Sequence, residues 1–228
     1  MPLILNIETS SAICSVCLSR DGEVISLKED NSGTNHASRL TIFIQELLDQ
    51  NNLSIQELDA IAVSAGPGSY TGLRIGVATA KGICFSITKP LIAVDSLHAL
   101  AEGMIAAHPN NGFLYCPTID ARRDEIYYSL IDLKSSILIP SNNVILAPTI
   151  PFDIPGDKSI LVGGTGAAKT IAQWNNSSLV YDETTLGSSK NMIAISNKKF
   201  YDSQFENVAS FEPAYIKPAF INPARRGS

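Results

Sequence analysis

Histidine and cysteine are scarce in this sequence, with three His and four Cys among 228 residues. The three histidines lie far apart, and no two have the spacing with which one helix binds a metal ion. Cys14 and Cys17 share one predicted strand, where an odd offset directs their side chains to opposite faces. We therefore expect no metal site, and we expect Cys14, Cys17, Cys84 and Cys116 to be reduced thiols rather than a disulfide framework.

Long apolar runs and clusters of basic residues are also missing. Polar or charged residues interrupt every apolar stretch before it reaches the length that crosses a bilayer. The N-terminus lacks the basic start of a secretory signal, and Glu8 interrupts its apolar run early. Seventeen Lys and Arg against 22 Asp and Glu give a net charge of −5, without the basic stripe that neutralises a phosphate backbone. We expect a cytoplasmic protein that does not contact membranes and binds nucleic acid poorly on its own.

The sequence does contain alternating strand and helix patterns. An apolar run opens the chain, and the pair Asp21-Gly22 supplies the positive φ angles of a hairpin turn. Apolar residues at positions 40, 43, 44, 47 and 48 recur at the spacing of one helix face. The first half of the chain therefore predicts strands at residues 3–9, 12–19, 23–29 and 59–65, and helices at residues 36–50 and about 69–86. The predicted order is βββαβα.

The second half repeats a similar order less regularly. It predicts strands at residues 113–119, 125–133, near 144–146 and 159–163, and helices near 167–174 and 190–201, while residues 140–157 predict an irregular surface connection. A recurring unit indicates internal duplication. We expect an α/β protein of two lobes, residues 1–105 and 106–228, and leave open whether the tail packs back on the first lobe. By analogy of element order, this is the duplicated ribonuclease-H-like fold of actin, sugar kinases and heat-shock ATPases, with two βββαβα-type lobes.

Residues 66–82, GPGSYTGLRIGVATAKG, admit two interpretations. Glycines before a helix can hold an anion at its N-terminus. The spacing fails the P-loop pattern, however, because Thr71 and Gly72 stand where that pattern requires Gly-Lys. The alternative interpretation is a packed interface.

The interface interpretation rests on the cost of glycine in a helix. Each such Gly costs roughly 1 kcal/mol relative to Ala, so Gly72, Gly76 and Gly82 require a packing reason. Gly72, Gly76 and Ala80 are four residues apart and form a ridge of small residues, against which another helix can pack closely. Leu73 and Val77 flank the ridge. We favour this interpretation, and the sequence leaves open whether the contact is intramolecular or intermolecular.

Two other segments are candidates for weak contact with a nucleotide. Glu8, Thr9 and Ser10 end the first predicted strand, where proteins of this architecture often place groups near a nucleotide's metal ion and phosphates. Glycines Gly163, Gly164 and Gly166 follow a later strand and would admit a ligand close to the backbone. The structural alternatives, a strand-end Glu bonded to a turn and a tight strand-to-helix turn, are favoured.

Charged residues are densest between Asp120 and Asp124, in the stretch DARRD. This stretch predicts a solvated hairpin tip whose local ion pairs contribute little stability, with partner docking as the alternative. No serine lies in a nucleophile-elbow pattern. The sequence therefore indicates no catalytic residue.

Six segments carry a family resemblance: ILNIETSSAICSVCLSRDGEV, HASRL, LDAIAVSAGPGSYTGLRIGVATAKG and PLIAVDSLHALA in about the first hundred residues, then IDARRDEIYYSL and the near-terminal EPAYIKP. Together they resemble the TsaB (YeaZ) family. The stretch GPGSYTGLRIGVATAKG is the most specific of them, and the region between the last two segments is loosely matched.

The resemblance implies a duplicated actin-like fold and a function in tRNA modification. It implies a non-catalytic subunit required for threonylcarbamoyl transfer to the adenosine next to the anticodon, bound to the catalytic paralogue TsaD and the ATPase TsaE. It leaves open a homodimer when the partner is absent, and it implies that tRNA binds only through the complex and that the isolated chain requires no cofactor. Binding of ADP or ATP at the complex interface is also left open. In the family the first two helices make the dimer contact, which here maps onto His36, Leu40, Phe43, Leu47, Gly72, Leu73, Gly76, Val77 and Ala80.

Two alternatives from other classes accompany this interpretation. One is an independent ATP-binding enzyme of the actin and sugar-kinase type, motivated by Glu8 to Ser10 and the glycines near Gly164. The other is a glycoprotease-like metallohydrolase. The catalytic paralogue carries a His-x-x-x-His metal pair in the helix after the meander, whereas this chain has His36 and Leu40. The missing pair disfavours the metallohydrolase.

Overall fold

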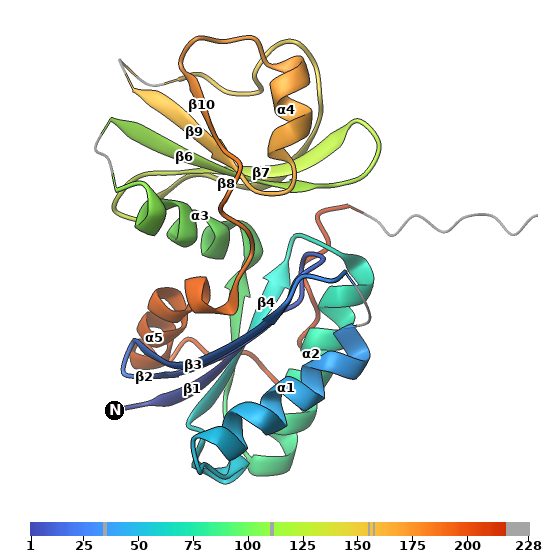
Figure 1. The fold of residues 1–228 in the computed structure, drawn as a ribbon, viewed down its shortest axis with the longest axis vertical. Helices are drawn as coiled ribbons and strands as arrows, with labels where there is room; N and C mark the ends of the chain where they lie inside the picture. The colour runs from blue at the N-terminus through green and yellow to red at the C-terminus, as the bar shows by residue number, and fades with distance from the viewer. Residues whose placement is uncertain (34–35, 110–111, 155, 157, 218–228) are drawn as a thin grey trace, which may run out of the picture.

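The computed structural model describes residues 1–33, 36–109, 112–154, 156 and 158–217. Over these residues the chain forms two five-stranded sheets of the same topology, with strand orders β3-β2-β1-β4-β5 and β10-β9-β6-β7-β8. Each sheet is an antiparallel three-strand meander to which two parallel strands are added. The sheets lie in two lobes, one above the other in Figure 1. This repetition confirms the duplicated ribonuclease-H-like fold.

The first sheet follows the sequence prediction, apart from its last strand. It consists of β1 (Leu3–Glu8), β2 (Cys14–Arg20), β3 (Glu23–Asp30), β4 (Ala60–Gly66) and β5 (Leu91–Asp95). Asp21 and Gly22 have φ angles of 52° and 88°, as the turn between β2 and β3 requires. Helices α1 (His36–Gln50) and α2 (Tyr70–Ile87) pack on this sheet. Strand β5 is missing from the prediction.

The second sheet corrects the sequence prediction at its edge. It consists of β6 (Phe113–Asp120), β7 (Glu125–Ile131), β8 (Ile137–Ile145), β9 (Ser159–Gly163) and β10 (Leu179–Asp182), with helix α4 (Ala167–Gln173). Residues 140–145 belong to β8, although the sequence predicted an irregular connection from residue 140 and a strand only near 144–146. Strand β8 pairs with β7 alone, so it tolerates Pro140 and a run of polar residues that hides the strand pattern.

The segment after β8 occupies the place between strands that α1 has in the first lobe. It inserts Phe152 into the second core, where the ring centroid lies 5.7 Å from that of Tyr128 and 6.2 Å from that of Trp174. Ile150 and Ile154 join the same hydrophobic cluster. Apolar side chains of a loop therefore cover this face of the second lobe in place of a helix.

The last helix of each lobe packs on the other lobe. Helix α3 (Ser96–Ala107), which the sequence did not predict, follows β5 but contacts β6 and β7 as well. Its residues Leu97, Leu100 and Met104 are buried with Tyr115 of β6. In return, the 3-10 helix η2 (Ser189–Met192) and helix α5 (Ile193–Tyr201), which together cover the predicted helix 190–201, pack on β1 and on its neighbours in the first sheet. The exchange, visible in the centre and lower left of Figure 1, joins the lobes into one body.

Buried polar groups fix the position of α5. The fully buried Asn6 of β1 accepts a hydrogen bond from Ser196 Oγ at 2.7 Å and donates one to Ser19 Oγ at 3.0 Å. Ser189 N–H donates to Ser15 Oγ at 2.9 Å. A polar group buried without a partner is costly, so these pairs specify which helix covers this face.

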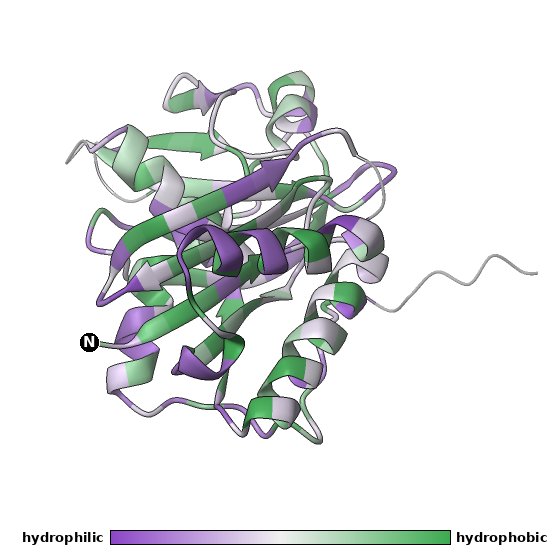
Figure 2. Cartoon of the chain, turned by 60° about the horizontal axis from the view of Figure 1, so that its bottom comes forward, coloured by the Kyte–Doolittle hydropathy of each residue, from purple (hydrophilic) through white to green (hydrophobic). Residues whose placement is uncertain are grey.

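Side chains elsewhere follow the usual division between core and surface. Hydrophobic and hydrophilic bands alternate along the helices in Figure 2. All four cysteines are free and buried, and burial raises the pKa of Cys17 and of Cys116 to about 12. Among the described residues, no helix combines the length and apolar character that a membrane span needs.

We predict that Ser196→Ala lowers the free energy of unfolding by about 1–3 kcal/mol, because Asn6 Oδ1 would remain buried without its donor. Urea unfolding measures the change. Ser86→Ala is the matched control, since Ser86 is exposed and donates only to the Ile83 carbonyl of its own helix, and it should change stability by less than about 0.5 kcal/mol. Equal losses in the two variants would contradict the assigned role of Ser196.

Candidate partner-binding surface

The ridge of small residues on α2 lies inside the protein. Gly72, Gly76 and Ala80 are buried. A Cβ added to Gly72 would lie 2.1 Å from the carbonyl oxygen of Thr9, and one added to Gly76 would lie 2.2 Å from Thr9 Oγ1. These glycines are therefore required by the turn after β1. At Gly72 and Gly76 the neighbours are the turn after β1 and Val63 of β4 rather than a second helix, and the interface role of the ridge stays a prediction.

The other residues predicted for the interface also face inward. Leu40, Phe43 and Leu47 of α1 and Leu73 and Val77 of α2 are at most 9% exposed and belong to the cores of the monomer. His36 is half-buried at the start of α1, with its Nε2 2.9 Å from the Ser11 carbonyl oxygen. The resemblance indicates the same two helices, α1 and α2. A partner could contact only the faces of these helices that point away from the core.

The outward face of α2 consists of residues that the sequence analysis did not single out, with the exception of Gly82. We define the α2 outer face as Tyr70, Arg74, Ala78, Gly82 and Phe85, all exposed. Phe85 is 84% exposed, and a Cβ added to Gly82 would have no atom of the described residues within 4 Å. A helical-wheel projection would have found this set, because all five lie opposite the buried stripe.

Two shallow grooves border the α2 outer face. One, of about 430 Å³, runs between α1 and α2 and is lined by apolar and polar side chains, among them Ile44, Leu48, Asp49 and Ile83. The other, of about 370 Å³, lies between α2 and the C-terminal segment. Grooves of this kind accept the side chains of a partner helix.

Aromatic side chains close the N-terminal end of the α2 outer face. The Arg74 guanidinium carbon lies 4.2 Å from the ring centroid of Tyr70, and Arg74 Nε donates to Tyr215 Oη at 3.3 Å. The Tyr70 and Tyr215 rings are 4.9 Å apart. Tyr, Trp and Arg are the residues that most often dominate binding energy at protein interfaces, so this cluster is a candidate anchor.

The first-lobe segment considered for phosphate or nucleotide contact is packed against its own chain. Ser69 N–H donates to the Ser10 carbonyl oxygen at 2.6 Å, and a Cβ on Gly68 would lie 2.3 Å from the same oxygen. Glu8 is buried and accepts from Ser10 N–H, and its burial raises the pKa of the carboxyl group. The Ser69 amide, just before α2, is thus bonded to the turn after β1. Nucleotide contact by Glu8, Thr9 and Ser10 remains a prediction.

The glycines of the second lobe form a tight turn. Gly164 has a φ of 90°, and a Cβ there would lie 2.3 Å from the Thr118 carbonyl oxygen. Thr118 Oγ1 donates to the Gly163 carbonyl at 2.7 Å, and Gly166 N–H donates to the Thr118 carbonyl at 3.3 Å. The chain itself accounts for these glycines, so the alternative of nucleotide contact at Gly163, Gly164 and Gly166 also remains a prediction.

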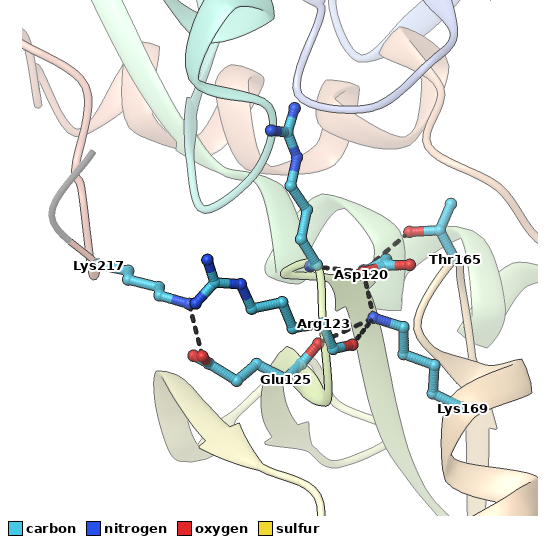
Figure 3. A network of polar contacts seen from close by, with 7 residues as sticks. Asp120, Arg123, Glu125, Thr165, Lys169 and Lys217 are labelled. Atoms are coloured by element: carbon cyan, nitrogen blue, oxygen red, sulfur yellow. Dashed lines mark hydrogen bonds and ion pairs between the residues drawn. The ribbon is translucent and has the colours of Figure 1, made fainter. Parts of the chain in front are cut away.

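The charged stretch from Asp120 to Asp124 forms a hairpin tip between β6 and β7 (Figure 3). Lys169 of α4 bonds Asp120 Oδ1 at 2.6 Å and the Arg123 carbonyl at 2.5 Å. Lys217 bonds Glu125 Oε1 at 2.6 Å. The tip is solvated, but the ion pairs of Asp120 and Glu125 join it to α4 and to the C-terminal segment rather than residues of the tip to one another. Within the described part of the chain, no group of three His, Cys, Asp or Glu is placed to hold a metal ion.

We predict opposite effects on stability for two glycines of α2. Gly76→Ala should lower the free energy of unfolding by about 1–3 kcal/mol, because the added methyl overlaps Thr9. Gly82→Ala should raise it by about 1 kcal/mol, because the site is open and Ala favours the helix. Denaturant titration of both variants provides the test, and Gly82 serves as the control for Gly76. A stabilised Gly76→Ala variant would contradict the packing described above.

Comparisons with known proteins agree with this structure. A family model for TsaD, tRNA N6-adenosine threonylcarbamoyltransferase, matches residues 30–176. The tRNA threonylcarbamoyladenosine biosynthesis protein TsaB of Bacillus subtilis (strain 168) is 35% identical over 164 residues, which cover 71% of this chain and 70% of that protein. TsaB of Escherichia coli (strain K12) is 27% identical over 220 residues, 94% of each chain.

A solved structure shows the same likeness over nearly the whole chain. YeaZ from Pseudomonas aeruginosa superposes with a TM-score of 0.81 at 25% identity, covering 94% of this chain and 100% of that chain. The alignment with the Bacillus subtilis protein covers more than two thirds of both chains, and the family model covers more than half of this one. The chain therefore belongs to the TsaB (YeaZ) family.

Proposed function

We propose that this chain is a non-catalytic subunit in the biosynthesis of threonylcarbamoyladenosine in tRNA. The names of its relatives support the biosynthetic role, and the match to a transferase model supports kinship with the catalytic subunit. The non-catalytic role is supported by Leu40, which stands where the catalytic paralogue has its second metal-binding histidine, and by the buried position of Glu8. The chain acts by binding that paralogue.

The observation that carries this proposal is Gly82. Glycine in a helix interior costs roughly 1 kcal/mol relative to Ala, and contacts with Thr9 explain the cost at Gly72 and Gly76. Gly82 has no such contact, and it lies on the face that also exposes Phe85. A partner that approaches the helix backbone closely would account for both residues.

The partner that fits this surface is a protein with the same helices. A paralogue of the same fold presents its own first two helices, so the two pairs of helices can pack ridges into grooves across a pseudo-twofold axis. In the absence of the paralogue, a second copy of this chain can occupy the surface in the same way. The ATPase TsaE and tRNA bind to the assembled complex, which is also where ADP or ATP would bind.

We predict that Phe85→Ala weakens binding to the catalytic paralogue by about tenfold or more, because an exposed aromatic anchor would be lost. Gly82→Leu should weaken binding at least as much, since its side chain would block close approach. Tyr201→Ala is the matched control, because Tyr201 is an exposed aromatic residue on α5, away from this surface. Calorimetric titration gives the dissociation constants. Unchanged constants for Phe85→Ala and Gly82→Leu would rule out this face.

Reconstitution tests the biosynthetic role. Purified partners are combined with threonine, bicarbonate, ATP and substrate tRNA, with and without this chain, and the modified nucleoside is quantified. We expect the product to depend on the chain, and the isolated chain to bind and hydrolyse no ATP with magnesium. Full product formation without the chain would contradict the proposal. Turnover of ATP by the chain alone would favour an enzyme of the sugar-kinase type.

A further inference from the structure

The C-terminal segment crosses from the first lobe to the second over the edge of the α2 outer face. We call residues 206–217 the strap. Glu206 N–H donates to the Leu91 carbonyl at 2.9 Å, and Ala214 N–H donates to the Ala65 carbonyl at 2.8 Å. Val208 and Phe211 pack against the first core. The strap therefore continues along the first lobe from β5 to the end of β4.

Lys81 and Gly66 are adapted to the strap. The ammonium group of Lys81 on α2 donates to the carbonyl oxygens of Ala209, at 3.2 Å, and Phe211, at 2.9 Å. Gly66 has a φ of 108°, and a Cβ there would lie 2.6 Å from the Ala214 carbonyl oxygen. These two positions hold the strap against α2 and β4.

The strap ends on the second lobe. Lys217 Nζ lies 2.6 Å from Glu125 Oε1, and the side chains are 31% and 17% exposed (Figure 3). The hydrogen bond from Lys217 lowers the pKa of Glu125. Glu212, Ala214 and Tyr215, just before this pair, are exposed, so few buried contacts hold the end of the strap. Segments of this kind open locally at low cost.

The strap also provides one wall of the groove beside α2. That groove of about 370 Å³ is lined by Arg74, Val77, Ala78 and Lys81 from the helix, and by Glu212, Pro213 and Tyr215 from the strap. Tyr215 completes the aromatic cluster with Tyr70 and Arg74. Detachment of the strap would open the groove and remove one ring of the candidate anchor.

We propose that the strap is a latch, closed by Lys217 and Glu125, that completes the docking surface for the catalytic paralogue. The inference rests on the proposed function of that surface. As a consequence, the affinity of the paralogue depends on both lobes of this chain. The helices belong to the first lobe, and the contact that holds the strap in place belongs to the second. A partner would then bind the latched form more tightly than the open form.

The test uses the full chain with Lys217→Met, Glu125→Lys, and the double variant Lys217→Glu with Glu125→Lys. Amide hydrogen exchange at Ala214 in the isolated chain reports on the latch, and the dissociation constant for the paralogue reports on docking. We expect each single change to raise both quantities about two- to fivefold and the exchanged pair to restore them. Lys89→Met is the matched control, because Lys89 is also 31% exposed and pairs with Asp59 at 3.5 Å, near the Glu206 end of the strap and away from Lys217.

Each outcome decides one part of the inference. Unchanged exchange at Ala214 in Lys217→Met would show that the pair does not latch the strap. Faster exchange with unchanged affinity would show that the strap lies outside the docking surface. A wild-type chain that does not bind the paralogue would contradict the proposed function and, with it, the docking role, while the exchange measurement would still decide whether the latch exists.

Discussion

The turn after β1 lies so close to the start of α2 that only glycine fits at the points of contact. Side-chain carbons at Gly68, Gly72 and Gly76 would overlap Ser10 and Thr9 by a wide margin. This close approach fixes the axis and the rotation of α2. Once the helix is placed, its small residues face inward, its apolar stripe enters the first core, and Arg74 and Phe85 face outward. The proposed partner surface is therefore a consequence of an internal contact.

The contact between the turn after β1 and α2 also affects the place where this fold could bind a phosphate. A helix N-terminus with nearby glycines is a ready site for phosphate, yet here the Ser69 amide is bonded to the Ser10 carbonyl, and the Gly72 amide donates to Ser69 Oγ. Glu8, behind the turn, is buried. The architecture that serves nucleotide enzymes is present, while the Ser69 amide closes the turn and the Gly72 amide caps its own helix. That pattern suits a subunit that binds a catalytic relative.

The exchange of α3 and α5 makes the two lobes dependent on each other. The buried Asn6 requires Ser196 from the end of the chain as its donor, and α3 supplies Leu100 and Met104 to the core of the second lobe. The strap adds a third link on the side of α2, through Lys217 and Glu125. The links through Asn6 and Ser196 and through Glu125 and Lys217 join residues far apart in the sequence, so no local pattern indicates them.

The sequence by itself determined the elements with strong local signals, and it indicated the family to which the chain belongs. Apolar periodicity defined α1, the Asp21-Gly22 pair defined the first hairpin, and the stretch GPGSYTGLRIGVATAKG indicated the TsaB family, because these signals depend on neighbours in the chain. Only the tertiary structure decided which side of α2 is buried, that Gly72 and Gly76 serve the Thr9 turn while Gly82 is open, and that residues 137–145 form an edge strand. The physical reason is that a small residue can permit close approach from either side, and only the three-dimensional packing shows which neighbour takes up the space.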